Sequence, residues 1–281
     1  MSATRFAPSP TGYLHKGHAF SALTAFQAAR RQGGRFVLRI EDIDHTRCRP
    51  HFEAAIYDDL AWLGLEWETP VLRQSQHLED YLDALRRLGA AGLLYRCFAT
   101  RREIAETMMS APHGAPDGYR GAPLTPADEA ARLAAGEPFA WRLNLAAAQA
   151  AAGALAFFEA GEGPLGQRGE IAVDAAAAGD VVLARKDVGV AYHLAVVVDD
   201  ARQGISEVVR GQDLFEATHV QRLLQRLLGL PEPRYRHHRL LAGPDGRRLA
   251  KRDRAETLRE LRARGVAAAE LRTELGFSPG P

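Results

Sequence analysis

The chain has 281 residues, of which 46% are hydrophobic and 25% charged, values that favour a folded globular protein and exclude extensive disorder. Because 36 Lys and Arg residues nearly balance 35 Asp and Glu residues, a nucleic-acid partner would have to meet a local basic patch. Two cysteines, Cys48 and Cys97, exclude a disulfide framework and a four-cysteine metal site, and no apolar run approaches the roughly 20 residues of a membrane span. We therefore expect a cytoplasmic protein without a membrane segment.

The first third of the sequence alternates strand and helix patterns. A short apolar strand at residues 4–7 leads through a Pro/Gly turn into helical spacing at 18–31. The segment "GGRFVLRIEDID", residues 33–44, is typical of a strand that ends in acidic residues at a site, and helices are predicted at 50–63 and 76–92. This alternation predicts an α/β fold with a doubly wound parallel sheet.

The middle of the chain breaks this pattern. From residue 100 onward, prolines and glycines separate alanine-rich pieces, and apolar runs that predict strands return in residues 180–211. A helix is then predicted at 213–230, a loop at 234–253, and a charged helical tail from residue 255.

These changes of texture predict how the chain is divided. We expect residues 1–99 and 180–230 to form the two halves of one catalytic domain, and residues 100–179 to be an insertion between them. Residues 231–281 would carry a basic loop and the helical tail.

Two histidines flank the start of the first predicted helix in the run His15-Lys16-Gly17-His18. The free N–H groups and the dipole of a helix N-terminus favour anions, so phosphates are a natural ligand there. The imidazoles could donate hydrogen bonds to a phosphate, and Gly17 would leave room for a flat ring against the backbone. Two histidines that merely cap and pack the helix are the alternative.

A second candidate lies near the other end, in "GPDGRRLAKRDRAE", residues 243–256. This Pro/Gly-rich loop surrounds Lys251 with arginines and could neutralise a polyphosphate. Taken alone, it could equally be a solvated basic turn.

Together, the two motifs resemble the HIGH and KMSKS signatures of class I aminoacyl-tRNA synthetases, although Ala250 replaces the serine of the second signature. The segments "RFAPSPTGYLHKGH", "FVLRIEDIDHTR", "AYHLAVVVDD" and "VVRGQDL" are similar, in order and spacing, to the glutamyl-tRNA synthetase group. The resemblance implies a Rossmann-like catalytic domain. It also implies that His15, Gly17, His18 and Lys251 bind ATP, with the two histidines and Lys251 taking part in catalysis.

The same resemblance implies a glutamate pocket. Its positions here are Arg5, Phe6, Ala7, Pro8, Ser9, Glu41, Tyr192 and Arg210. A planar guanidinium can make a two-point pair with a carboxylate, which suits Arg5, and the resemblance assigns the substrate's α-ammonium group to Glu41. Glu41 could instead pair with a neighbouring arginine, and Tyr192 could belong to the core.

Members of the group often carry zinc in the insertion. Cys97 and Tyr119 fall at two ligand positions, but Ala99 and Pro123 replace the other two. Because a structural zinc site needs four donors, we predict that no metal binds there.

Because a separate anticodon-binding domain would need about 50 residues or more, we expect none in the residues that follow Lys251. In this it resembles the stand-alone members of the group, which attach glutamate to queuosine at the wobble position of tRNA(Asp). The resemblance implies ATP with Mg²⁺, L-glutamate and a queuosine-containing anticodon stem-loop as ligands, and we expect a monomer. The arginines of "RYRHHR" and "RRLAKRDR" are the expected RNA-binding surface.

Three alternatives stay open. The chain could be a truncated glutamyl-tRNA synthetase that charges a tRNA 3′ end, or an inactive paralogue that binds RNA or regulates another protein. It could also be a small-molecule nucleotidyltransferase, although the glutamate-pocket residues would then be unexplained.

Overall fold

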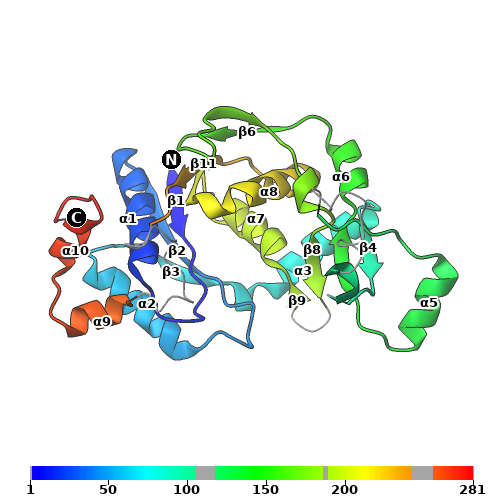
Figure 1. Cartoon of the computed structure of the whole chain (residues 1–281), viewed down its shortest axis with the longest axis horizontal. Coiled ribbons are helices and arrows are strands. Elements are labelled where there is room, and N and C mark those ends of the chain that lie inside the picture. Colours follow the sequence, from blue (N-terminus) through cyan, green and yellow to red (C-terminus); the bar gives the residue numbers. More distant parts are fainter. Residues whose placement is uncertain (1, 101, 106–117, 186–188, 242–255, 281) are drawn as a thin grey trace.

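The computed structural model describes residues 2–100, 102–105, 118–185, 189–241 and 256–280 (Figure 1). Two groups of strands lie edge to edge at its centre. The first consists of β1 (Ala3–Phe6), β2 (Arg35–Ile40) and β3 (Glu68–Arg73), all parallel and in the order β1-β2-β3. The second, in the order β10-β11-β6-β7, contains β10 (Glu207–Gly211), β11 (Arg234–His238), β6 (Ala156–Glu159) and β7 (Gly169–Ala172), with β7 antiparallel to β6.

Strand β1 links the two groups through Ser206, the residue before β10. The Ser206 N–H donates to the Ala3 carbonyl at 3.0 Å, and the Ser206 hydroxyl oxygen accepts from the Ala3 N–H at 2.9 Å. The parallel strands of both groups therefore end at one common edge, which is where doubly wound folds place their ligands. The predicted fold class is confirmed.

Helices cover both faces of this sheet, as the sequence of β2 requires. Phe36 and Leu38 pack into one core, whereas Val37 packs into another with Phe157 and Val208. A strand that is apolar on both faces is buried between two layers. The first layer contains α1 (Lys16–Arg31), α2 (Pro50–Trp62), α9 (Leu258–Ala263) and α10 (Ala268–Glu274), which lie together in Figure 1.

A third core joins helices to an antiparallel sheet. The helices are α3 (Leu78–Ala90), α6 (Leu145–Ala152), α7 (Tyr192–Arg202) and α8 (Phe215–Leu228). The sheet, in the order β4-β5-β8-β9, consists of β4 (Leu94–Cys97), β5 (Ala140–Leu143), β8 (Val182–Arg185) and β9 (Gly189–Val190). Helix α5 (Pro126–Ala134) lies at the outer end of this region in Figure 1, and short 3₁₀ helices occupy Gln74–Gln76, Ala176–Ala178 and Gln212–Leu214.

Two predicted elements are wrong. The apolar run that predicted a strand within 192–202 is helix α7, because a helix buried among other helices is apolar on most sides and resembles a buried strand. The start of the predicted loop at 234–253 is strand β11, in which Tyr235 and His237 are buried.

Strands β6 and β7 lie inside the range predicted as an insertion, 100–179, yet pair with the central sheet. The boundaries of that insertion stay a prediction.

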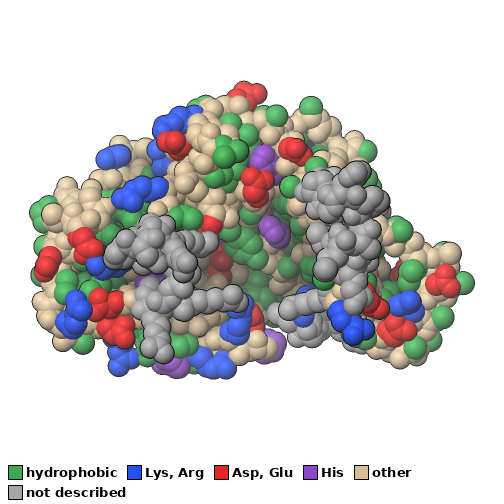
Figure 2. Space-filling view, viewed as in Figure 1, with side chains coloured by type: hydrophobic (Ala, Val, Ile, Leu, Met, Phe, Trp, Pro, Cys, Tyr) green, Lys and Arg blue, Asp and Glu red, His purple; other side chains and the backbone are tan. Residues whose placement is uncertain are grey.

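No helix of the described part of the chain is long and apolar enough to cross a membrane. The face shown in Figure 2 is hollowed near its centre, with hydrophobic and histidine side chains at the floor of the hollow.

Candidate active site

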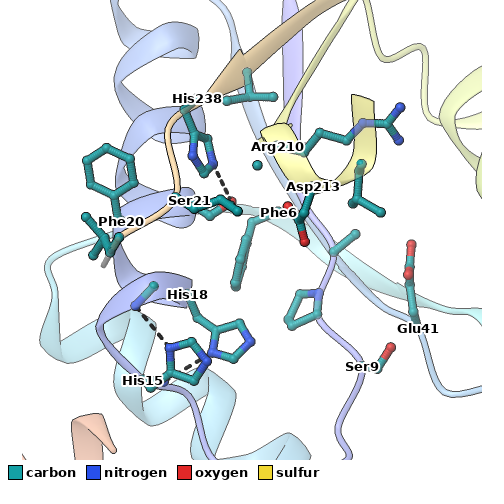
Figure 3. Close-up of a pocket in the computed structure, with 18 of the residues that line it drawn as sticks. Phe6, Ser9, His15, His18, Phe20, Ser21, Glu41, Arg210, Asp213 and His238 are labelled. Atoms are coloured by element: carbon teal, nitrogen blue, oxygen red, sulfur yellow. Dashed lines mark hydrogen bonds between the residues drawn. The ribbon is translucent and has the colours of Figure 1, made fainter. Parts of the chain in front are cut away.

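A cavity of about 550 Å³ lies at the carboxyl edge of the central sheet, beyond β1 and β10. Every predicted ligand-binding residue that the structure describes lines it. These are Arg5, Phe6, Ala7, Pro8, Ser9, His15, Gly17, His18, Glu41, Tyr192 and Arg210. Figure 3 shows His15 and His18 on one side of the cavity, with Glu41 and Arg210 on the other.

Lys251 lies outside the described residues. The chain on each side of residues 242–255 does reach the site: Leu241 lines the cavity, and the Leu258 N–H donates to the Leu14 carbonyl at 2.8 Å, next to His15. The described residues before and after 242–255 therefore lie beside the cavity.

The two histidines form the N-terminal cap of α1. The Nδ1 atom of His15, the N-cap residue, accepts a hydrogen bond from the Gly17 N–H at 3.0 Å. The Nδ1 atom of His18 accepts one from the His15 N–H at 3.2 Å, which completes a reciprocal capping box. Both histidines therefore cap the helix, as one interpretation of the sequence held. This capping does not exclude a ligand.

This capping fixes the tautomer of both imidazoles. A ring nitrogen that accepts a backbone N–H cannot carry a proton, so in the neutral rings of His15 and His18 the proton resides on Nε2. Two Nε2–H donors are therefore set at a helix N-terminus, where the helix dipole already favours anions. This arrangement can stabilise phosphate oxygens.

Gly17 is required by the position of the His15 ring. A Cβ atom at residue 17 would lie 2.9 Å from Cε1 of His15, closer than real Cβ atoms approach, and 3.1 Å from its Nδ1, a distance tighter than most real contacts. The sequence predicted that Gly17 makes room for a flat ring, and the ring that uses this room is the imidazole of His15.

Arg5 is buried beneath the cavity, with 5% of its surface exposed. Its Nε and Nη2 atoms donate to the two carboxylate oxygens of Asp200 at 3.1 and 3.4 Å, and Nη1 donates to the Val209 carbonyl at 3.2 Å. The two-point pair that the sequence assigned to a substrate carboxylate is thus made with Asp200. A ligand could use only the remaining N–H on each terminal nitrogen.

A second buried guanidinium, that of Arg39, connects this pair to Glu41. Arg39 is fully buried and donates to Asp200 at 2.8 Å and to Glu41 at 3.1 Å, and its Nε lies 3.7 Å from Asp199. The sequence left open whether Glu41 pairs with a neighbouring arginine, and the structure shows that it pairs with Arg39. Glu41 also lines the cavity, so its carboxylate can still meet a ligand.

Charges in this cluster do not balance. The two cations Arg5 and Arg39 face three carboxylates, Glu41, Asp199 and Asp200, which leaves one negative charge in excess when all are ionised. Burial raises the pKa of Glu41, although Arg39 and Arg5 act in the opposite direction. A ligand ammonium group beside Glu41 would compensate the excess charge and favour the ionised carboxylate.

Arg210 differs from Arg5 because its partners are uncharged. It is 4% exposed and donates to His237 at 3.2 Å, to Gln221 at 2.7 Å and to Thr218 at 2.7 Å. No carboxylate of the described residues forms an ion pair with it. A buried cation beside a cavity with no ionic partner in contact is suited to a ligand carboxylate.

The last predicted residue, Tyr192, is the first residue of α7 and is 36% exposed. Its ring packs edge-on against His193, with centroids 5.6 Å apart, so it belongs to the cavity wall rather than to the core.

Several cavity residues were not predicted. The His238 Nε2 atom hydrogen-bonds Ser21 at 3.1 Å, its ring packs against Phe20 at 5.1 Å, and Asp213 lines the wall near Arg210 (Figure 3). The histidine pair in "RYRHHR" was a possible signal, but it was interpreted only as part of a basic surface. His238 is the second of these histidines.

Cys97 and Tyr119, which fall at zinc-ligand positions of the group, lie side by side, with Cys97 Sγ 3.8 Å from the Tyr119 hydroxyl. In the described ranges, no three His, Cys, Asp or Glu side chains gather as metal ligands would. Because such an arrangement does not establish the metal content of the protein, the absence of zinc stays a prediction.

The fold and the cavity define a class of enzyme, and comparison with known families agrees. Residues 2–276 match the family "tRNA synthetases class I (E and Q), catalytic domain". A protein of Rhodobacter capsulatus named glutamyl-Q tRNA(Asp) synthetase is 49% identical over 98% of this chain and 99% of its own length. One of the same name from Symbiobacterium thermophilum is 43% identical over 100% and 87%. The chain belongs to the glutamyl-Q tRNA(Asp) synthetase family of class I synthetases, which are ligase-type enzymes.

Longer relatives share the catalytic core. Glutamate–tRNA ligase 1 of Ruegeria pomeroyi is 40% identical over 99% of this chain, which covers 61% of that protein. The crystal structure of a glutamate tRNA ligase from Elizabethkingia meningosepticum in complex with its amino acid superposes with a TM-score of 0.72 and 26% identity, over 90% of this chain and 52% of that one. The chain thus spans about half of that solved structure. Methionyl-tRNA synthetase of Mycobacterium tuberculosis, with a TM-score of 0.55 and 12% identity over 98% of this chain and 63% of its own, shares the fold alone.

Proposed function

We propose that this protein activates L-glutamate with ATP and transfers it to queuosine at the wobble position of tRNA(Asp). The observation that carries the proposal is the similarity to glutamyl-Q tRNA(Asp) synthetases over nearly the whole length of both chains. The longer glutamate–tRNA ligases are also similar, but this chain covers a smaller share of them.

Glutamate would bind with its ammonium group beside Glu41 and a carboxylate against Arg210. The first contact is supported by the excess negative charge that the buried ion pairs of Arg5 and Arg39 carry when all groups are ionised. The second is supported by the absence of an ionic partner for Arg210 among the described residues. Ser9 and the backbone of residues 6–8 line the cavity between β1 and α1 and would complete the pocket.

ATP would place its phosphates at the N-terminus of α1. In the first step, the α-carboxylate of glutamate attacks the α-phosphorus, the bond to the β-phosphate oxygen breaks, and pyrophosphate leaves with that electron pair. The Nε2–H groups of His15 and His18 would stabilise the negative charge, and we assign the same role to Lys251. Magnesium would arrive bound to the phosphates of ATP.

In the second step, a hydroxyl of the queuosine cyclopentenediol attacks the activated carbonyl carbon, and AMP leaves as the ester forms. An anticodon loop can present a splayed nucleotide to a cavity, as single-stranded RNA commonly does. Among the arginines expected to bind RNA, Arg239 lines the cavity, whereas Arg236 pairs with Glu207 at 2.9 Å. We therefore assign RNA contact to Arg239 first. We also propose that the protein is a cytoplasmic monomer.

Pyrophosphate exchange with glutamate in the absence of tRNA tests the first step, with glutamine as the control amino acid. Transfer of labelled glutamate to tRNA(Asp) with and without queuosine, alongside tRNA(Glu), tests the second. We expect label only on the queuosine-containing tRNA(Asp), because a site that hydrogen-bonds a hydroxyl rejects analogues lacking it by about 10⁴–10⁵. Label at the 3′ end of tRNA(Glu) would replace our proposal with a truncated glutamyl-tRNA synthetase.

A further inference from the structure

Behind Arg210 lies a chain of buried polar groups that the mechanism above does not use. The Arg210 Nε–H points to Nε2 of His237 at 3.2 Å, and Nδ1 of His237 lies 2.6 Å from Oε2 of Glu159. Glu159, His237 and Arg210 are 1%, 2% and 4% exposed. They come from three neighbouring strands, β6, β11 and β10, so the chain of contacts crosses the sheet.

The positions of the protons in this series of contacts follow from the groups at its two ends, Arg210 and Glu159. A guanidinium can only donate, so Nε2 of His237 must accept from Arg210 and carries no proton. At the other end, Oε1 of Glu159 accepts the backbone N–H groups of Gly161 at 2.7 Å and His237 at 2.9 Å, which leaves Oε2 as the acceptor that faces the ring. The remaining proton of the neutral imidazole therefore lies on Nδ1 and is donated to Oε2.

The neutral state of His237 agrees with its surroundings. Burial lowers the pKa of His237, and Arg210 lowers it further, whereas the hydrogen bond to Glu159 acts in the opposite direction. A doubly protonated ring would direct an N–H at the N–H of Arg210.

We propose that Glu159 is the counter-ion of Arg210, relayed through His237, and that this relay orients the guanidinium for the substrate carboxylate. Arg5 shows the alternative: a carboxylate in direct contact occupies the guanidinium fork, as Asp200 does at 3.1 Å. Each of the two arginines keeps one N–H on each terminal nitrogen for a ligand, but with an imidazole interposed the carboxylate that compensates Arg210 does not touch it, which leaves direct ionic contact to a ligand carboxylate. Glu159 and His237 are positioning residues that do not touch the substrate. The inference rests on the proposed binding of glutamate at Arg210.

Glu159→Gln tests the relay because it keeps the shape and removes the negative charge and one of the two acceptor oxygens. If the new amide oxygen receives the two backbone N–H groups, its NH₂ group faces Nδ1 of His237, and the ring must move its proton to Nε2, against Arg210. We expect KM for glutamate in pyrophosphate exchange to rise about tenfold or more, as for a lost hydrogen bond to a charged group, with KM for ATP changed less than about threefold.

Glu207→Gln is the matched control. Glu207 is also a buried carboxylate of the central sheet, 3% exposed, but it pairs with Arg236 and Gln32. Its replacement should leave KM for glutamate within about twofold of the wild type. Equal effects of the two substitutions on KM would reduce Glu159 to a structural residue and overturn the proposal.

The tautomer of His237 gives a readout that needs no activity. Long-range ¹H–¹⁵N spectra of protein labelled at histidine should show the proton on Nδ1 in the wild type and on Nε2 in Glu159→Gln. A proton on Nε2 of His237 in the wild type would overturn the relay. If the variant does not fold, the wild-type spectrum is sufficient for this test. A wild type with the Nδ1 proton but no glutamate-dependent exchange would refute the proposed function and leave the relay in place.

Discussion

Replacement of Gly17 by alanine should separate catalysis from stability. The new Cβ would lie 2.9 Å from Cε1 of His15, so the ring must move and lose its 3.0 Å bond to the backbone of residue 17. Alanine gains about 0.5–1 kcal/mol over glycine within a helix, and loss of the cap bond costs about 1 kcal/mol. The free energy of unfolding should therefore change by less than about 1 kcal/mol. Displacement of one phosphate-facing donor should slow adenylate formation about 10–100-fold.

The assay is glutamate-dependent pyrophosphate exchange, with thermal unfolding of the same samples. Gly89→Ala is the matched control, because Gly89 also lies in a helix, α3, and a Cβ there would meet only Leu94 Cδ1, at the ordinary distance of 3.9 Å. The control should keep its exchange rate. Wild-type exchange by Gly17→Ala would refute the reasoning, because the ring of His15 would then be free to move without consequence.

Four further substitutions or measurements test other parts of the molecule. His18→Ala should slow exchange about 10²–10³-fold with little change in glutamate binding, and an unchanged rate would remove the histidine from the mechanism. Arg5→Lys should lower the melting temperature and raise KM for glutamate, because an ammonium cannot span both oxygens of Asp200; a wild-type melting curve would contradict this. Burial raises the pKa of Asp59 from 3.8 to about 6, although Arg262 acts in the opposite direction. The folded protein therefore loses stability as the pH rises from about 4 to 6, because the buried carboxyl group must ionise. Asp59→Asn should therefore be more stable than the wild type at pH 7, by about 1–3 kcal/mol, with the gain lost below about pH 4 in denaturant titrations. Finally, elemental analysis should find no stoichiometric zinc, and one zinc per chain would refute the interpretation of Ala99 and Pro123.

Local patterns were sufficient for the elements that surround the histidines. The helix predicted at 18–31 is found at Lys16–Arg31, and the strand predicted at 4–7 is found at Ala3–Phe6, because a proline turn separates an apolar run from a clear helical period. The same reasoning failed for α7, whose apolar residues face neighbours on most sides, so that no period was visible. Burial on all sides removes the signal on which such predictions depend.

Pairings distant in the sequence could not be predicted from it. The motif that contains Asp200 was recognised, yet nothing in its spacing indicated that this carboxylate would pair with Arg5, which precedes it by 195 residues. The same holds for Glu159 and His237, whose contact depends on β6 and β11 being neighbours in the sheet. Sequence patterns placed residues at the cavity, and tertiary pairing determined which of their N–H groups and oxygens are left for a ligand.

We propose that the selectivity of the cavity for a dicarboxylic amino acid follows from how its counter-charges are arranged. Behind one wall, of which Arg5 and Glu41 line the cavity, three carboxylates outnumber Arg5 and Arg39, which favours a ligand ammonium group when all are ionised. On the other, Arg210 has its compensating charge on Glu159, one imidazole away, and turns N–H donors toward the ligand. The amide of glutamine carries no charge and could direct an NH₂ group at these donors, so it would leave the buried guanidinium without an ionic partner in direct contact. Discrimination between the two amino acids thus depends less on the shape of the cavity than on keeping Glu159 out of contact with Arg210.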